Sequence, residues 1–175
     1  MLSRATLLLG LVLLVGCEPT NQGYEPLQPI AYSHAVHAGA SEIPCQYCHF
    51  GVQRGRYAGI PPATVCMNCH EQVKKDNGEV VKVRTAIESD EPIAWVRVHR
   101  LPDHAFFDHS AHVVSAEIEC LECHGSVEFM GRVQQWSSLT MGWCLDCHRQ
   151  GTGDGDDGVP ANVINRLTDC SVCHH

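Results

Sequence analysis

Apolar and polar positions along this chain follow few regular patterns. Residues 6–15 form a short apolar run near the N-terminus. Over residues 79–89 apolar side chains, from Val80 to Ile87, recur at helical spacing and predict one amphipathic helix. Residues 95–99 alternate as a short extended segment does. Elsewhere Gly, Pro and polar residues interrupt the pattern every few positions, so we expect short α-helices within a mostly irregular fold.

The apolar run follows Arg4 and has the length of a signal-peptide core, about half of the roughly 20 residues that a membrane span needs. It ends in Leu-Val-Gly-Cys at residues 14–17, which resembles the lipobox of bacterial lipoproteins. We therefore expect residues 1–16 to be a cleaved lipoprotein signal peptide. Residues 17–31 would be a flexible tether from a lipidated Cys17, which anchors the protein to a membrane of the bacterial cell envelope. An ordinary signal peptide with an incidental cysteine is the alternative.

The composition of the 175 residues is unusual in its content of cysteine and histidine. Aromatic residues make up only 6% of the chain, whereas 11 Cys and 12 His are present. So many sulfur and imidazole ligands in a chain of this length indicate metal or cofactor chemistry rather than ordinary packing. The formal net charge of −8 leaves no basic surface that would neutralise phosphates, which excludes a general nucleic-acid-binding protein.

The cysteines follow a single pattern. Apart from Cys17, they form five C-x-x-C pairs, and each pair is followed directly by histidine. This is the attachment motif of c-type haem, in which two thiols bond to one edge of the macrocycle and the histidine binds the iron. We therefore predict five covalent c-type haems. The motifs are Cys45/Cys48/His49, Cys66/Cys69/His70, Cys120/Cys123/His124, Cys144/Cys147/His148 and Cys170/Cys173/His174.

Other uses of paired cysteines explain the pattern less well. Exported proteins often carry disulfides, but a disulfide framework does not require a histidine after every second cysteine. Thioredoxin-type C-x-x-C motifs lack that histidine as well. Zinc ribbons also use paired C-x-x-C units, yet zinc binding gives no reason for a histidine at the fifth position of every motif. Covalent haem is therefore the favoured interpretation.

The haem motifs belong to an internal repeat. An aromatic-x-His-x-x-His segment precedes the first motif and recurs 75 residues later, before the third motif, and the second and fourth motifs are 78 residues apart. The chain therefore contains a duplicated two-haem unit. We expect these units at residues 32–78 and 105–150, with a connecting segment at 79–104 and a linker with the fifth haem site at 151–175. The two repeated segments are Tyr32/His34/His37 and Phe107/His109/His112.

Two histidines at positions i and i+3 lie on one side of a helical turn but point in somewhat different directions, so they can serve two adjacent haems. This arrangement resembles the class III multihaem cytochromes, of cytochrome c3 and c7 type. The resemblance implies that each pair supplies the distal iron ligands of its two-haem unit. On that basis His34 serves the Cys45/Cys48 haem, His37 the Cys66/Cys69 haem, His109 the Cys120/Cys123 haem and His112 the Cys144/Cys147 haem.

The fifth haem, at Cys170/Cys173, needs a distal ligand from elsewhere in the chain. His175 is unsuitable because its neighbour His174 already occupies one face of the iron. His99 and His104 are the candidates, and we favour His99. A methionine ligand would raise the reduction potential of the haem. The methionines considered are Met67, Met130 and Met141.

Segments around the motifs resemble a narrower family, the pentahaem cytochrome c subunit of bacterial alternative complex III, over roughly residues 32–175. This resemblance implies a periplasm-facing electron carrier in a complex whose membrane and iron–sulfur subunits take electrons from a quinol. The electron acceptor would be a cytochrome c or a terminal oxidase. The segments that carry the resemblance are residues 58–62, 64–70, 92–95, 98–103, 107–112 and 139–144.

The expected fold class is a class III multihaem cytochrome c. The 159 residues after position 16 leave about 32 residues for each haem, so the haems themselves would form much of the core. Enough histidines are present to cap every iron, which favours a non-catalytic electron carrier over an enzyme with an open iron position. The alternatives are a subunit of a quinone-reducing complex fed by periplasmic electrons, and a free-standing multihaem shuttle or reductase.

Overall fold

The computed structural model describes residues 20–150 and 161–174 of the chain. Within these ranges the chain forms ten short helical segments and no β-strand. The longest of them, α4, has 11 residues. The expected class of short helices within a mostly irregular fold is confirmed. The segments are η2 (Ala35–Ala40), α2 (Cys45–Cys48), α3 (Ala63–His70), α4 (Gly78–Glu88), η3 (Ala111–Ser115), α5 (Cys120–His124), η4 (Val127–Phe129), α6 (Met141–Gln150), α7 (Ala161–Leu167) and α8 (Cys170–Cys173).

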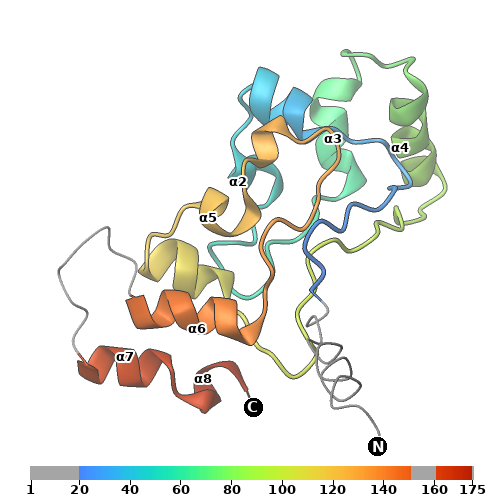
Figure 1. Ribbon diagram of the computed structural model, residues 1–175. Helices are drawn as coiled ribbons and strands as arrows, with labels where there is room; N and C mark the ends of the chain where they lie inside the picture. The colour runs from blue at the N-terminus through green and yellow to red at the C-terminus, as the bar shows by residue number, and fades with distance from the viewer. Residues whose placement is uncertain (1–19, 151–160, 175) are drawn as a thin grey trace, which may run out of the picture.

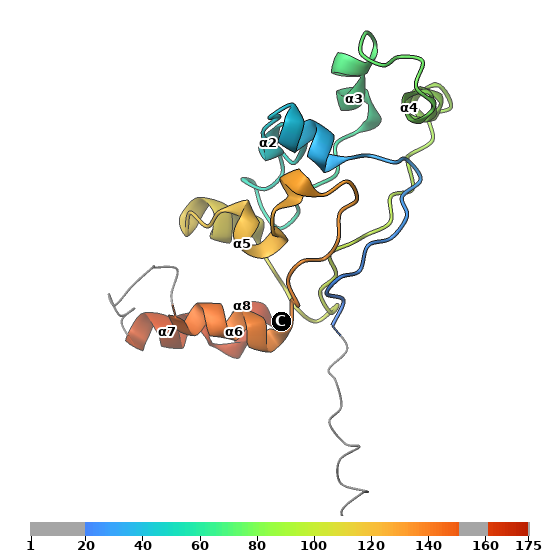
Figure 2. The same cartoon turned by 45° about the horizontal axis from the view of Figure 1, so that its top comes forward.

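The helices are spread along an elongated molecule (Figure 1). α3 and α4 lie at one end, α6, α7 and α8 lie at the other, and α2 and α5 lie between them, in both views (Figure 2). Two non-helical segments, residues 20–31 and 92–100, run side by side along the molecule. Gln28 joins them, because its side-chain amide donates to the Val96 carbonyl at 2.9 Å and accepts the Val96 N–H at 2.9 Å.

Helix α4 is the element that the sequence pattern predicted best. Asn77 caps its N-terminus, since the side-chain oxygen accepts the Glu79 N–H at 2.9 Å. Val80 and Val83 are buried on one face of the helix. That face packs against α3, which carries the second haem motif. The helix therefore supports one end of the row of motifs.

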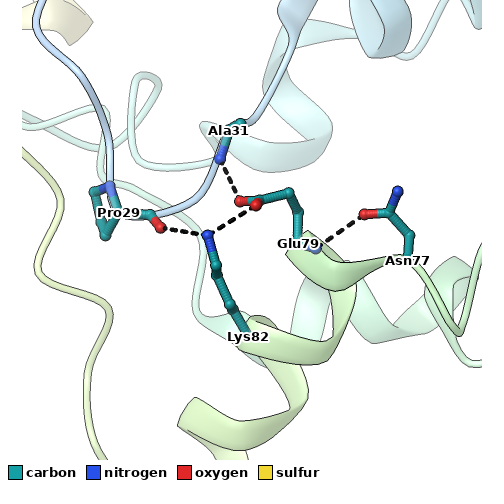
Figure 3. A network of polar contacts seen from close by, with 5 residues as sticks. All are labelled: Pro29, Ala31, Asn77, Glu79 and Lys82. Atoms are coloured by element: carbon teal, nitrogen blue, oxygen red, sulfur yellow. Dashed lines mark hydrogen bonds and ion pairs between the residues drawn. The ribbon is translucent and has the colours of Figure 1, made fainter.

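A small polar network ties α4 to the chain that leads into the first distal histidines (Figure 3). The Glu79 carboxylate accepts the Ala31 N–H at 2.7 Å and the Lys82 ammonium at 2.7 Å. Lys82 also donates to the Pro29 carbonyl at 3.4 Å. These groups are exposed, so their contribution is more to geometry than to stability. They fix the position of residues 29–31 beside α4, directly before the aromatic-x-His-x-x-His segment.

Contacts between the two halves of the chain place η2 against η4. The Ala35 N–H donates to the Met130 carbonyl at 2.9 Å. Gly39 of η2 lies so close to the Glu128 carbonyl that a Cβ atom there would collide with it. Glycine is therefore required at this position by the close approach of the two backbones. This contact holds the distal segment of the first unit against the second unit.

The protein core is thin. Among the described residues only four hydrophobic side chains are buried, and one large side chain, Gln135, is completely buried. Its amide donates to the Ser137 carbonyl at 3.1 Å and accepts the Arg100 N–H at 3.3 Å, so the buried polar group is satisfied. Side chains alone do not supply a core of the usual size. The four buried hydrophobic residues are Ile30, Val52, Val80 and Val83.

No helix within residues 20–150 and 161–174 has both the length and the apolar character needed to cross a bilayer. The predicted signal peptide at residues 1–16 and the predicted lipidation site at Cys17 lie outside the described residues. Most of the predicted linker, residues 151–160, and His175 also lie outside them. The lipid anchor therefore stays a prediction.

Candidate haem-binding sites

Each of the five cysteine pairs lies on a single helical turn. α2, α5 and α8 begin at the first cysteine of a motif, whereas α3 and α6 carry their motifs further along the helix. Residues three positions apart in a helix are neighbours on its surface, so the two sulfur atoms of each pair lie on one side. None of the ten motif cysteines forms a disulfide. Paired cysteines on one side of a helix are what attachment along one edge of a macrocycle requires.

The motif cysteines differ in exposure. Cys69 and Cys147 are exposed, as are Cys45 and Cys170, whereas the other six motif cysteines are half-buried. The physical reason is that protein atoms alone do not cover these positions on α3 and α6, where the edge of an attached macrocycle would lie. The predicted haem attachment at Cys69 and Cys147 therefore rests on the spacing of the motif rather than on burial by the chain, and it stays a prediction.

The first distal segment leads into η2. The Tyr32 ring stacks on His37, with 4.3 Å between ring centres and 19° between planes. It meets His34 edge-on, at 4.8 Å and 82°. Burial raises the pKa of Tyr32 to about 12, and the adjacent Cys48 and Cys66 of two different motifs add to the rise. Tyr32 therefore separates the two imidazoles at the place where the first and second haem motifs meet.

The second distal segment leads into η3 and repeats this arrangement. Phe107 stacks on His112 at 4.4 Å and 29°, and it meets His109 edge-on at 4.9 Å and 88°. The Asp108 carboxylate accepts the Ser110 hydroxyl at 2.7 Å and the Ser110 N–H at 2.8 Å. These bonds, the hydroxyl first, lower the pKa of Asp108. The repeat seen in the sequence is thus also a repeat of side-chain geometry.

The structure brings each distal imidazole of the duplicated units to the motif histidine predicted for it. The ring centres of His34 and His49 are 6.4 Å apart with planes at 4°, and those of His109 and His124 are 6.4 Å apart at 1°. Because an imidazole nitrogen lies about 2 Å from a bound metal, two imidazoles on opposite sides of one metal place their ring centres about 6 Å apart. The spacing therefore fits one iron atom per pair. The other pairs are His37/His70 and His112/His148, each 6.0 Å apart, with planes at 65° and 24°.

The fifth site differs from the sequence-based expectation. His104, not His99, faces His174, with 5.5 Å between ring centres and 26° between planes. The backbone explains this placement, since the Phe106 N–H donates to the Cys173 carbonyl at 2.7 Å and His174 Nδ1 donates to the His104 carbonyl at 2.9 Å. His99 lies beside a different haem motif. The structure therefore favours His104, the other candidate from the sequence, as the distal ligand of this site. The sequence could not choose between the two, because a contact between residues 70 positions apart leaves no local signal.

Backbone carbonyls fix the tautomers of most of these imidazoles. In seven of them the Nδ1 atom lies within hydrogen-bond distance of a carbonyl oxygen. Since a carbonyl only accepts, Nδ1 carries the proton and the Nε2 lone pair is left for a metal. The bonds of motif histidines are His49 to Gly59 (2.7 Å), His70 to Val73 (2.8 Å), His148 to Leu167 (2.8 Å) and His174 to His104 (2.9 Å). Those of distal histidines are His37 to Ser33 (2.8 Å), His109 to Arg56 (2.6 Å) and His112 to Asp108 (2.8 Å).

Burial keeps two of the imidazoles uncharged near neutral pH. It is the main cause that lowers the pKa of His34 to about 4, and neighbouring histidines lower it further. The same causes, burial first, lower the pKa of His124 to about 4. The neutral form is the one that has a lone pair for a metal. His34 also differs from the seven histidines above, because its buried Nδ1 atom has no hydrogen-bond partner among the residues that the structure describes.

The five motifs form one continuous row. At each junction in the row, a thiol of one motif raises the pKa of a thiol in the neighbouring motif, as a cause second to burial. The order in space is the second, first, third, fourth and fifth motif, which Figure 1 shows as α3, α2, α5, α6 and α8. The two units therefore meet through the first and third motifs. The neighbouring thiols are Cys48 with Cys66, Cys45 with Cys120, Cys123 with Cys147 and Cys144, and Cys144 with Cys173.

The backbone partners of the imidazoles could not have been found from the sequence. The Arg56 carbonyl accepts from His109, and the Arg56 guanidinium lies 4.3 Å over the Phe106 ring, so one residue contacts two distant segments. The Gly59 carbonyl accepts from His49 in the same way. Every residue has a carbonyl group, so no residue type marks those that bind an imidazole. Only the folded backbone identifies them.

A cysteine pair beside two facing imidazoles, repeated along the chain, is the arrangement that a c7-like multihaem fold requires. Residues 105–175 match the family model described as cytochrome c7 and related cytochrome c. This range covers the second two-haem unit, the linker and the fifth motif, and it supports the c7-like fold and c-type haem as the cofactor.

This chain is also similar to a known protein over a longer range than the family model covers. That protein is the multihaem cytochrome c subunit of menaquinone reductase from Nitratidesulfovibrio vulgaris, which is 29% identical over 158 residues. The aligned region covers 84% of this chain and 67% of the relative. The similarity therefore extends beyond the matched family region into the first two-haem unit. The protein is accordingly related to a multihaem subunit of a quinone-linked redox complex.

Proposed function

We propose that this protein is a five-haem electron-transfer subunit of a membrane quinone oxidoreductase complex. The observation that carries the proposal is the continuous row of five thiol pairs, each beside two imidazoles that face each other across about 6 Å. Bound c-type haem supplies one-electron transfer. The residues that would hold it are the ten motif cysteines, the five motif histidines, and His34, His37, His104, His109 and His112.

The ligand arrangement supports an electron carrier rather than an enzyme. Two imidazoles on one iron leave no open position for a small substrate, and such an iron changes charge with little movement of its ligands. His104 completes this arrangement at the fifth motif, in place of the predicted His99. All five sites are then equivalent in ligand type. The chain's own contribution is to fix the orientation of the imidazoles through hydrogen bonds from Nδ1 to backbone carbonyls.

The proposed direction of electron flow rests on the relative. That protein is named as a subunit of a menaquinone reductase, which supports electron flow toward a quinone. In this arrangement a periplasmic donor would reduce the row, and membrane subunits would pass the electrons to the quinone. The protein would be held at the periplasmic side of the membrane by a lipidated Cys17. This assignment replaces the quinol-oxidising direction as the leading hypothesis.

A second candidate is a quinol-oxidising complex of the alternative complex III type. It is supported by the segments at residues 58–62, 98–103 and 139–144, which resemble the pentahaem subunit of that family. Its partners would include an iron–sulfur subunit and an electron-accepting cytochrome c or oxidase. Both candidates give this chain the same role as an electron-carrying subunit. They differ in whether electrons flow toward a quinone or away from a quinol.

The two candidates are separated by purification from native membranes through an affinity tag on this subunit. The complex would be assayed for reduction of a menaquinone analogue by a reduced periplasmic cytochrome, and for oxidation of the corresponding quinol. We expect membrane subunits to co-purify and quinone reduction to dominate. Quinol oxidation with an iron–sulfur subunit present would establish the second candidate. Recovery of the cytochrome alone, without quinone activity, would contradict both.

A further inference from the structure

One motif histidine has an unusual hydrogen-bond partner. The other four motif histidines point Nδ1 at a backbone carbonyl, whereas His124 Nδ1 lies 3.2 Å from His99 Nε2. The two rings meet edge-on, with 4.5 Å between centres and 84° between planes. The third motif, at the middle of the row, therefore has a side chain where the other four have a backbone group.

The direction of this hydrogen bond follows from the role of His124. Its ring pairs with His109 in the parallel geometry that fits a shared metal, which assigns Nε2 to the metal and leaves the proton on Nδ1. His124 Nδ1 then donates and His99 Nε2 accepts.

The fold holds His99 firmly at this place. Next to it, the Arg100 N–H donates to the side-chain oxygen of the fully buried Gln135 at 3.3 Å. The Gln135 amide donates to the Ser137 carbonyl at 3.1 Å, and the Ser137 hydroxyl donates to the Cys123 carbonyl at 2.8 Å. A continuous set of hydrogen bonds thus links the backbone beside His99 to the backbone beside His124.

We propose that His99 is a positioning residue that accepts a hydrogen bond from the haem ligand His124 and thereby sets the reduction potential of the third haem. The inference rests on the proposed function, because it requires a haem at Cys120/Cys123. An acceptor on Nδ1–H makes the ligating imidazole more basic, and a more basic ligand favours the oxidised, more positively charged iron. Loss of the acceptor should therefore raise the potential of this haem alone.

The experiment compares full-length, haem-loaded wild-type protein with His99→Leu, which removes the acceptor, and His99→Gln, whose side-chain oxygen can accept. Haem absorbance is titrated against potential, and ferric EPR reports the spin state. In His99→Leu we expect five low-spin haems and an upward shift of one potential, by about tenfold in its equilibrium constant or about 59 mV. His99→Gln should restore most of that shift.

A second set of variants tests whether the shifted reduction potential belongs to the third haem. Cys120→Ser/Cys123→Ser removes the attachment site, and adding His99→Leu to it should move none of the four remaining potentials. Five unchanged potentials in His99→Leu would overturn the proposal, and so would a new high-spin haem, which would make His99 an iron ligand. Absence of haem from the Cys120/Cys123 peptide by mass spectrometry would instead overturn the proposed function on which the inference rests.

Discussion

At the scale of single residues, the two nitrogens of each imidazole have different tasks. Nδ1 donates to a carbonyl in seven of the histidines, which orients the ring and leaves Nε2 as the metal-binding atom. The residue type is therefore only part of what makes a ligand. The carbonyl opposite Nδ1 decides which way the ring faces.

The distal ligand proposed for the fifth site, His104, can be tested directly. Replacement of His104 by alanine should convert one haem of five to a high-spin form, because His104 is the imidazole that faces His174, at 5.5 Å, among the residues that the structure describes. EPR of the ferric protein measures the change. His99→Leu is the matched control and should keep every haem low-spin. A fully low-spin spectrum of His104→Ala would show that another residue ligates this iron.

Gly125, directly after the third haem motif, is a residue whose replacement should be costly. Its φ is +67°, and an added Cβ atom would lie 2.5 Å from Cγ of the Trp136 ring. Gly125→Ala should therefore lower the free energy of unfolding by about 2 kcal/mol or more. Denaturant unfolding followed by circular dichroism measures this change.

Gly131→Ala provides the control for Gly125→Ala. Nothing lies within 4 Å of a Cβ atom added at Gly131, and its φ is not positive. The free energy of unfolding should stay within about 1 kcal/mol of the wild type. Equal losses in the two variants would contradict the assignment of strain to Gly125.

At the scale of elements, an amphipathic pattern predicted helix α4 correctly but could not predict the shorter helices. Val80 and Val83 fix its buried face, and Asn77 fixes its start. The other described helices are too short for periodicity to register, since most contain four to eight residues. The haem motifs mark α2, α3, α5, α6 and α8 instead.

The buried face of α4 gives a matched pair of variants. Val83→Ala should lower the free energy of unfolding by about 2 kcal/mol, because two buried methyl groups are lost and a cavity is left. Val83 is 7% exposed, whereas Val81 on the opposite face is 42% exposed. Val81→Ala should thus have little effect in the same denaturant titration. If the two variants lose equal stability, α4 does not pack through Val83.

At the scale of the whole molecule, the row of motifs takes the place of an ordinary core. Four buried hydrophobic side chains in the described ranges are few for a chain of 175 residues. Conformational entropy opposes folding by about 1–2 kcal/mol per residue, so a core of this size cannot balance it. Covalent haem would supply the missing apolar surface in the middle of the fold, and it would cover the exposed thiols of Cys69 and Cys147.

Removal of haem should consequently prevent folding. The chain expressed without haem attachment should give a far-ultraviolet circular dichroism spectrum of an unfolded protein and be digested rapidly by protease. The haem-loaded protein should resist digestion except near its ends. A cooperative thermal transition in the haem-free chain would contradict this prediction.

The row adds a spatial order to the organisation expected from the sequence. The repeat predicted two successive two-haem units with a fifth site attached. In the structure the order is second, first, third, fourth and fifth motif. The motifs at residues 66–70 and 170–174 are therefore the two ends at which electrons would enter and leave.

The sequence by itself predicts the covalent chemistry. Five C-x-x-C-H motifs predict the attachment residues and one axial ligand each, because both are set by spacing of a few residues along the chain. The 75-residue repeat also predicts the distal pairs His34/His37 and His109/His112, since each pair lies at a fixed offset from its motif. Local spacing is sufficient for these features, as it is for α4.

Only the tertiary structure decided what depends on contacts between distant segments. His104 and His99 are close in sequence, yet the first meets His174 and the second meets His124. The pairing of residues 104–106 with residues 173–174 selects between them, and no pattern of residue types encodes that pairing. The spatial order of the motifs is decided in the same way, because backbone hydrogen bonds between segments are open to every residue type.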